Sequence, residues 1–179
     1  MLNSASAAIK RVDRGADVIL GGMWGPRSAN RVVTPVKPYL QRLYAIKGIE
    51  ASFDSIALHP YASNVEGSLA AVEVARGALE RARDRRAGIW VTEIGWAAGG
   101  PRKSPYVKGK KGQAKLLSQT LAQLRSRRRT FRLRGVFWYS WRDKHGGESI
   151  CEWCGHAGLR AKSGSAKPAW RAFAKVAKR

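Results

Sequence analysis

The chain alternates between two hydrophobic periods. Apolar residues recur every three or four positions in five segments, which predicts amphipathic helices at residues 2–14, 35–47, 69–82, 113–128 and 168–177. Four short and nearly continuous apolar runs lie between these helices, at residues 17–23, 55–61, 88–94 and 135–141. Runs of this kind are typical of strands buried in a parallel sheet. The sequence therefore predicts an α/β fold in which helices and strands alternate.

Two architectures fit this order of elements. Right-handed βαβ units around a sheet covered on both faces describe a doubly wound fold, and they equally describe part of a (β/α)8 TIM barrel. No Gly-x-Gly-x-x-Gly or Walker loop follows any predicted strand, so a nucleotide-binding fold has no support and we expect no cofactor. The 179 residues suffice for one domain. A complete barrel usually needs about 250 residues.

Three polar residues stand where the predicted strands end. Glu93 ends the third strand, and His59 and Tyr61 end the second, so they meet at the edge where parallel βα folds build active sites. A carboxylate among apolar residues is costly unless it is solvated or hydrogen-bonded, and a tyrosine hydroxyl that donates to it keeps it ionised. Residues two apart on a strand point to the same side, so both rings can reach Glu93. The alternatives are an ion pair at a barrel rim and ordinary ring packing.

Five segments together resemble a known group of proteins. LHPYA, IWVTEIGW, GVFWYSWRD, CGHAGL and KPAW are similar to the last four βα units of the clan A glycoside hydrolases, with bacterial family 39-like and family 5-like sequences the nearest in character. The resemblance extends from Ile9 to Val176. It implies a partial (β/α)8 barrel of strands five to eight with a leading helix, and hydrolysis of a β-linked glycan with retention of configuration. Glu93 would be the nucleophile, and His59 and Tyr61 would match the His-x-Tyr of strand six.

Four tryptophans are candidate substrate-binding residues, because aromatic rings bind the flat C–H faces of sugars at little ordering cost. Trp96, Trp138, Trp141 and Trp153 lie at strand ends or in the loops that follow them. By the resemblance, Trp138 or Trp141 matches the sugar platform of the last strand, and Trp141 is favoured because it lies nearer the end of the strand. Trp153 would lie in the last active-site loop. Packing is the alternative for each ring.

The resemblance lacks one essential residue. The acid/base glutamate of the family follows strand four in an Asn-Glu-Pro-like motif, and no Asn-Glu pair occurs here. The first helix matches the helix after that motif, so we expect the N-terminal half of the barrel to be absent. Glu148 and Glu152 in the last loop are the only conceivable substitutes. Half a barrel leaves unpaired sheet edges, so we expect the isolated chain to need a complementary half-barrel or to self-associate, and to be weakly active or inactive.

The charge is strongly basic, with 34 Lys and Arg against 12 Asp and Glu, a formal net charge of +22. Such a field favours nonspecific binding of polyanions such as nucleic acid. The basic residues are spread over the chain, with runs at residues 108–111 and 125–129, and spread charge is more typical of a solvated surface. No helix-turn-helix or aromatic–basic strand motif accompanies it. A nucleic-acid-binding protein and a non-catalytic carbohydrate-binding protein that uses Trp141 and Trp153 are the alternatives to a glycosidase.

Cys151 and Cys154 lie in a Cys-Glu-Trp-Cys motif within a long loop at residues 142–167. We expect a structural thiol pair or a small disulfide. Zinc ligation with His145 and His156 is the alternative, but the second pair lacks the usual spacing, so we expect no metal. No apolar run approaches the roughly 20 residues of a membrane span, and residues 1–4 lack the features of a signal peptide, although similar enzymes are secreted.

Overall fold

The computed structural model describes residues 1–24, 34–144 and 151–177, which form an α/β fold around a parallel four-stranded sheet. The strands, in spatial order, are β1 (Ile19–Trp24), β2 (Ser55–His59), β3 (Gly88–Ile94) and β4 (Leu133–Trp138). The α-helices are α1 (Leu2–Val12), α2 (Val36–Tyr44), α3 (Val65–Arg81), α4 (Gly109–Ser126), α5 (Arg128–Phe131) and α6 (Pro168–Ala177), and the 3-10 helices are η1 (Ile49–Ser52) and η2 (Cys154–His156). Sequential parallel strands joined by helices are compatible with part of a TIM barrel. None of the described helices is long and apolar enough to cross a membrane.

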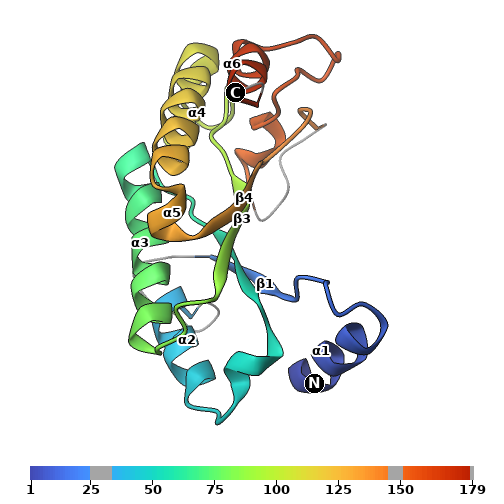
Figure 1. Ribbon diagram of the computed structural model, residues 1–179. Helices are drawn as coiled ribbons and strands as arrows, with labels where there is room; N and C mark the ends of the chain where they lie inside the picture. The colour runs from blue at the N-terminus through green and yellow to red at the C-terminus, as the bar shows by residue number, and fades with distance from the viewer. Residues whose placement is uncertain (25–33, 145–150, 178–179) are drawn as a thin grey trace.

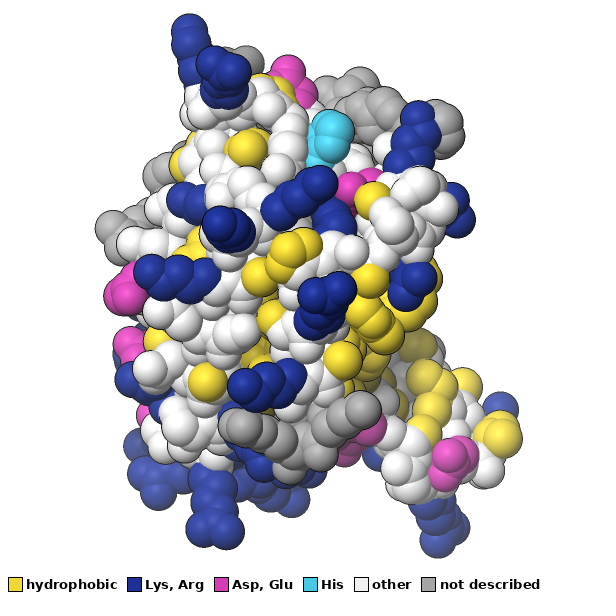
Figure 2. Space-filling view, turned by 90° about the horizontal axis from the view of Figure 1, so that it is seen from above, with side chains coloured by type: hydrophobic (Ala, Val, Ile, Leu, Met, Phe, Trp, Pro, Cys, Tyr) yellow, Lys and Arg dark blue, Asp and Glu magenta, His cyan; other side chains and the backbone are white. Residues whose placement is uncertain are grey.

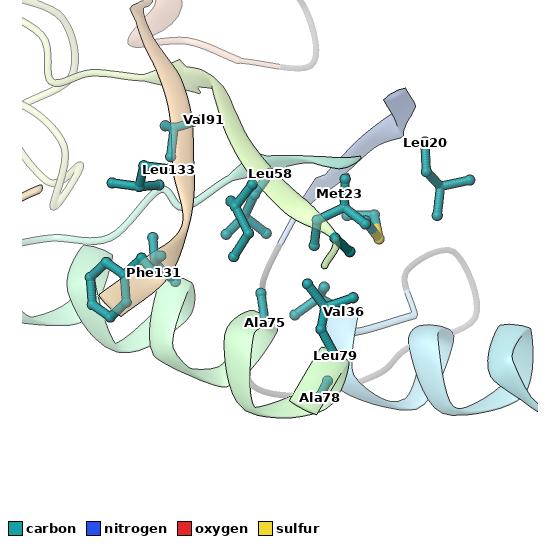
Figure 3. Packing of buried hydrophobic residues seen from close by; sticks show 14 of the residues in the cluster. Leu20, Met23, Val36, Leu58, Ala75, Ala78, Leu79, Val91, Phe131 and Leu133 are labelled. Atoms are coloured by element: carbon teal, nitrogen blue, oxygen red, sulfur yellow. The ribbon is translucent and has the colours of Figure 1, made fainter. Parts of the chain in front are cut away.

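The main hydrophobic core lies between the sheet and the helices on one of its sides. Figure 1 shows α2, α3, α4 and α5 on this side. Leu58 of β2 and Val91 of β3 belong to this core together with Ala75 and Leu79 of α3, and all four side chains are fully buried (Figure 3). The near-continuous apolar runs of the central strands supply the sheet side of this core.

The opposite face of the sheet is only partly covered by the described residues. Trp90 of β3 stacks on Phe137 of β4 with ring centroids 6.0 Å apart, and Phe137 is 55% exposed. The indole N–H of Trp90 donates to Asp17 Oδ2 at 2.8 Å, and the Ser55 hydroxyl donates to the same carboxylate. The prediction that both faces are covered is therefore wrong for β1 and β4, where exposed and buried positions mix. In a closed barrel this face would line the interior.

The boundaries of the elements agree with the prediction to different degrees. β3 occupies the predicted residues 88–94. β2 ends at His59 rather than at residue 61, because proline follows and the backbone N–H of Tyr61 turns back to the His59 carbonyl at 2.9 Å. α3 begins at Val65, four residues earlier than predicted, where the Asn64 side chain caps it by accepting a backbone N–H three residues on.

A buried ion pair fastens the long loop that follows β4. Lys167 Nζ lies 2.8 Å from Asp143 Oδ1 and 3.0 Å from Oδ2, and it also donates to the His156 carbonyl at 3.1 Å. The two side chains are 3% and 14% exposed, respectively. Burial lowers the pKa of Lys167, while Asp143 opposes that shift. Asp143 also accepts the Gly158 N–H at 2.8 Å, so one carboxylate joins both ends of the loop.

We expect Asp143→Ala to lower the free energy of unfolding by about 3–5 kcal/mol, because it leaves the Lys167 ammonium buried without a countercharge. Adding Lys167→Met to this variant should recover most of the loss, since an apolar side chain of similar length then fills the site. Urea unfolding followed by tryptophan fluorescence measures both changes. Equal stability of Asp143→Ala and the unmodified chain would contradict this account.

Candidate active site

The ends of β2 and β3 bring together the three polar residues predicted there. The two strands pair in parallel with Leu58 opposite Val91, so the residues that follow lie at the same edge of the sheet. The Tyr61 hydroxyl donates to Glu93 Oε2 at 3.0 Å, and His59 Nδ1 lies 3.4 Å from the same oxygen. The Glu93 side chain is 37% exposed, so a carboxylate held from the neighbouring strand still faces solvent.

The imidazole of His59 occupies space that a glycine in β1 leaves open. A Cβ atom added at Gly22 would lie 2.5 Å from His59 Nε2 and 2.7 Å from its Cε1, far inside van der Waals contact. The register between β1 and β2 shifts at this point, between Leu20 and Met23. Gly22 is therefore a positioning residue, because a larger side chain there would push the imidazole away from Glu93.

Tyr61 lies at the centre of a group of aromatic rings. Its ring makes edge-to-face contacts with His59, Tyr106, Tyr139 and Trp153, at centroid distances between 5.4 and 6.5 Å. Burial raises the pKa of the Tyr61 phenol well above its usual range, and the negative charge of Glu93 and the hydrogen bond to it raise it further. Tyr61 is therefore a neutral donor whose direction is fixed by the surrounding rings.

Two loops place a stacked pair of rings beside Tyr61. Trp153 and Tyr106 stack with centroids 4.9 Å apart and an interplanar angle of 22°. Cys151 and Cys154 form a disulfide that closes a short loop around Trp153. The backbone N–H of Ala97 donates to the Tyr106 carbonyl at 2.9 Å, which ties the loop after β3 to the end of that strand.

The disulfide bears directly on the zinc alternative. Sulfur atoms joined to each other cannot serve as zinc thiolates. Within residues 1–24, 34–144 and 151–177, no three His, Cys, Asp or Glu side chains are grouped as a metal site would require. Of the two predicted histidine ligands, His156 belongs to η2 and His145 lies outside the described residues.

An aromatic cavity of about 470 Å³ opens at this edge of the sheet. Its lining consists of Trp24, His59, Tyr61, Glu93, Tyr106, Tyr139, Cys151, Trp153 and Cys154. Apolar rings with a few convergent polar groups are typical of sites for small organic ligands. Among the described residues that line it, Glu93 carries the only carboxylate.

Sequence reasoning missed three of the rings in this lining, those of Trp24, Tyr106 and Tyr139. The rule that located Glu93 would also have located Trp24, which is the last residue of β1. Tyr139 directly follows β4, but only tryptophans were predicted as substrate-binding rings at the end of this strand. Tyr106 lies in the loop after β3, and nothing in its local sequence indicates that this loop folds back over the site.

Three of the four predicted tryptophans lie outside the cavity lining. Trp96 is fully buried, and its indole N–H donates to a backbone carbonyl, so it has no face for a sugar. Trp138 is partly buried between the two hydrophobic clusters and donates to the Ala157 carbonyl at 3.1 Å. Trp141 is 58% exposed and meets Trp170 edge to face at 5.1 Å. β4 ends at Trp138, so the predicted strand over residues 135–141 is wrong at its C-terminal end, and Trp141 lies three residues beyond the strand.

Of the two predicted substitutes for the missing acid, the structure describes Glu152. Glu152 lies between the two cysteines with an exposed side chain and is not part of the cavity lining. Glu148 lies outside the described residues. The described residues thus supply a candidate nucleophile, and no other carboxylate among them lines the cavity.

Comparison with known proteins supports the fold. No protein-family model and no curated protein sequence matches the chain. Its structure is similar to that of a thermostable mutant of a xylanase from Cellvibrio japonicus (TM-score 0.66, 11% identity, 98% of this chain and 53% of that chain). It is also similar to a glycoside hydrolase family 17 β-1,3-glucanosyltransferase from Rhizomucor miehei (TM-score 0.55, 14%, covering 94% and 57%) and a family 39 glycoside hydrolase from Bacteroides cellulosilyticus (TM-score 0.53, 21%, covering 98% and 43%).

These similarities, all below 25% identity, show the fold alone, and that fold is the glycosidase-like α/β fold of the TIM-barrel neighbours. The chain spans about half the length of each neighbour, at 53%, 57% and 43% of the three. The α/β fold and the partial barrel predicted from the sequence are therefore confirmed. The resemblance to clan A is confirmed at the level of fold alone.

The raised pKa of Tyr61 predicts a loss of stability at alkaline pH. An unfolded tyrosine loses its proton near pH 10, whereas the folded state keeps that proton to higher pH. Between these two values the unfolded state binds fewer protons, so the free energy of unfolding falls by about 1.4 kcal/mol per pH unit for one such group. Tyr61→Phe should make the decline above about pH 10 shallower, measured by urea unfolding across that range. Tyr44 and Tyr106 also have raised pKa values, so some decline in stability should remain in Tyr61→Phe. A decline as steep as that of the unmodified chain would contradict the assignment.

Proposed function

We propose that the chain forms the C-terminal part of a retaining glycosidase acting on a β-linked glycan, with Glu93 as the nucleophile. The observation that carries the proposal is the 3.0 Å hydrogen bond from the Tyr61 hydroxyl to Glu93, in the wall of an aromatic cavity at the carboxyl end of a parallel sheet. The glycosidase-like fold supports the same class of reaction. Aromatic rings around the carboxylate of Glu93 suit a sugar, which offers apolar C–H faces and a carbon open to attack.

In the proposed reaction, one oxygen of Glu93 attacks the anomeric carbon while the bond from that carbon to the leaving oxygen breaks. Tyr61 and His59 both approach Oε2, which leaves Oε1 as the attacking atom. The hydrogen bond from Tyr61 fixes the orientation of the Glu93 carboxylate before the substrate binds. A second carboxyl group donates a proton to the leaving oxygen and later takes one from the water that releases the sugar.

The proposed second carboxyl group belongs to a part of the barrel beyond the described strands. Two observations support completion by further βα units, in the same chain or a separate one. The face of the sheet that would line a barrel carries the exposed ring of Phe137, and the structural neighbours are roughly twice as long as this chain. General acid catalysis is typically worth about 10²- to 10⁴-fold, so the chain without this group would be weakly active or inactive on natural glycosides.

A mechanism-based label tests the nucleophile without requiring an acid. Dinitrophenyl 2-deoxy-2-fluoro-β-glycosides carry a leaving group that departs unprotonated, and the fluorine slows release of the trapped sugar. With a panel of such sugars, we expect the mass of the chain to increase by one glycosyl group, located on the peptide that contains Glu93. Glu93→Gln should abolish the label, because an amide oxygen is a far weaker nucleophile.

Glu152→Gln is the matched control, since this glutamate is exposed and lies outside the cavity lining. It should label like the unmodified chain. Equal labelling of Glu93→Gln, or a label found on another residue, would overturn the assignment of the nucleophile.

Carbohydrate binding without turnover is the second candidate function, and the stacked Trp153–Tyr106 pair is the observation that favours it. We expect Trp153→Ala to weaken binding of β-linked oligosaccharides about tenfold, because it removes a ring from the cavity wall. Trp141→Ala is the matched control, since this exposed tryptophan lies away from the cavity lining, and it should leave affinity unchanged. Isothermal titration calorimetry with a panel of oligosaccharides measures both. A greater loss in Trp141→Ala would move the sugar site to the surface around Trp141.

A further inference from the structure

The basic residues at 125–129 include Arg128 and Arg129, and in the structure these two arginines line a surface hollow. We propose that this hollow, at the N-terminal end of β4, binds phosphate groups independently of the cavity at Glu93. Its volume is about 420 Å³, and four of its five lining residues are arginines. The lining consists of Arg128, Arg129, Arg132, Leu133 and Arg134.

The local backbone fixes where these arginines stand. α5 ends at Phe131, and Arg132 takes a left-handed conformation with φ of 52°. Phe131 and Leu133 are both buried in the core, so Arg132 and Arg134, which alternate with them, are turned outward. Arg128 donates from Nε to the Leu133 carbonyl at 3.4 Å, which draws a third guanidinium toward the same point. The hollow is thus built on a rigid turn between a helix and a strand.

The arginines of the hollow have little negative charge near them among the described residues, where the pKa of Asp54 is lowered chiefly by the hydrogen bond from Lys10 and only weakly by Arg134. No Asp or Glu in that part of the chain forms an ion pair with any of the four. The neighbouring acids are already engaged: Asp54 pairs with Lys10 at 2.8 Å, and Asp84 accepts the Tyr44 hydroxyl at 2.7 Å. Four like charges around one small volume repel one another, and a bound anion relieves that repulsion.

The loop before β3 extends the basic surface. β3 and β4 are neighbours with Ile89 opposite Leu133, so the segments that precede them lie at the same edge of the sheet. The exposed arginines of that loop are Arg83, Arg85 and Arg86, and Arg81 at the end of α3 is also exposed. On the face seen from above, Figure 2 shows lysines and arginines at many separate places. The concentration of arginine in one hollow therefore distinguishes this edge from the general positive field.

The geometry of the donors favours phosphate over carboxylate. A carboxylate is planar and is satisfied by one guanidinium that donates to both oxygens. A phosphate group spreads its charge over several oxygens in a tetrahedral arrangement, so more than one arginine can donate to it at once. The same chemistry is offered by free inorganic phosphate and by the phosphodiester backbone of a nucleic acid, and the adjoining arginine loop favours a chain of phosphates.

The test compares two variants that lose the same charge. Arg132→Gln with Arg134→Gln removes two guanidinium groups from the hollow, and Arg102→Gln with Arg171→Gln removes two exposed arginines that lie outside its lining. Fluorescence anisotropy with a short mixed-sequence single-stranded oligonucleotide measures affinity at constant ionic strength. We expect the first variant to lose about tenfold or more in affinity, and the control to lose much less. The slope of log affinity against log salt concentration should become shallower by about 1.4 in the first variant, because two phosphate contacts are lost. Urea unfolding of both variants checks that their folds are intact.

Competition identifies the source of the phosphate. Displacement of the oligonucleotide by a low concentration of inorganic phosphate would indicate a site for a single phosphate group. If inorganic phosphate does not displace it, the site recognises a phosphodiester chain. Both outcomes support phosphate binding at the hollow. Equal losses in the two double variants would show that only net charge matters and would overturn the proposal. The phosphate assignment would also fail if polygalacturonate, which carries carboxylates alone, competed as well as the oligonucleotide per unit of charge.

Discussion

The hydrogen bond from Tyr61 to Glu93 is the interaction on which the candidate site depends, because it satisfies a carboxylate that the fold has partly removed from water. Parallel pairing of β2 and β3 ends both strands at one edge, so the donor comes from the strand beside the acceptor. The ring of Tyr61 is in turn held by four aromatic neighbours. One of them is His59, whose imidazole occupies space that Gly22 leaves open. If β2 and β3 paired in another register, Glu93 would lose the hydrogen bond from Tyr61, and the cavity would change shape.

The sequence predicted correctly that Tyr61 reaches Glu93, although the argument from side-chain alternation along the strand was partly wrong. Strand parity was expected to place His59 and Tyr61 on one side of an extended segment. In the structure β2 stops at His59, and the chain turns so that the N–H of Tyr61 meets the His59 carbonyl. The two rings still reach Glu93, because a tight turn at a strand end keeps the next residues near that edge. The location of polar residues at strand ends was a sounder guide than the direction of each side chain.

The tryptophans show where sequence reasoning had too little information. Both faces of the last strand are apolar, so parity could not distinguish Trp138 from Trp141, and the structure assigns neither ring to the cavity. Tyr139 lines it instead, beyond the point where β4 ends and parity stops predicting direction. Tyr106 and Trp153 meet through contacts between distant loops, which no local pattern encodes. Whether such residues line the cavity depends on the path that the chain takes after each strand.

The parallel sheet also separates two chemically opposite sites. At its C-terminal edge, the described lining of the cavity consists mainly of aromatic rings around the carboxylate of Glu93, a composition that suits a neutral sugar better than an anion. At its N-terminal edge, the hollow is lined by four arginines and Leu133, a concentration of positive charge that favours anions. β3 and β4 run from one edge to the other, so a phosphate-bearing ligand bound at the hollow would leave the carboxylate free. The strongly basic composition need not therefore conflict with a glycosidase-like fold, since the two ends of the same strands can serve different ligands.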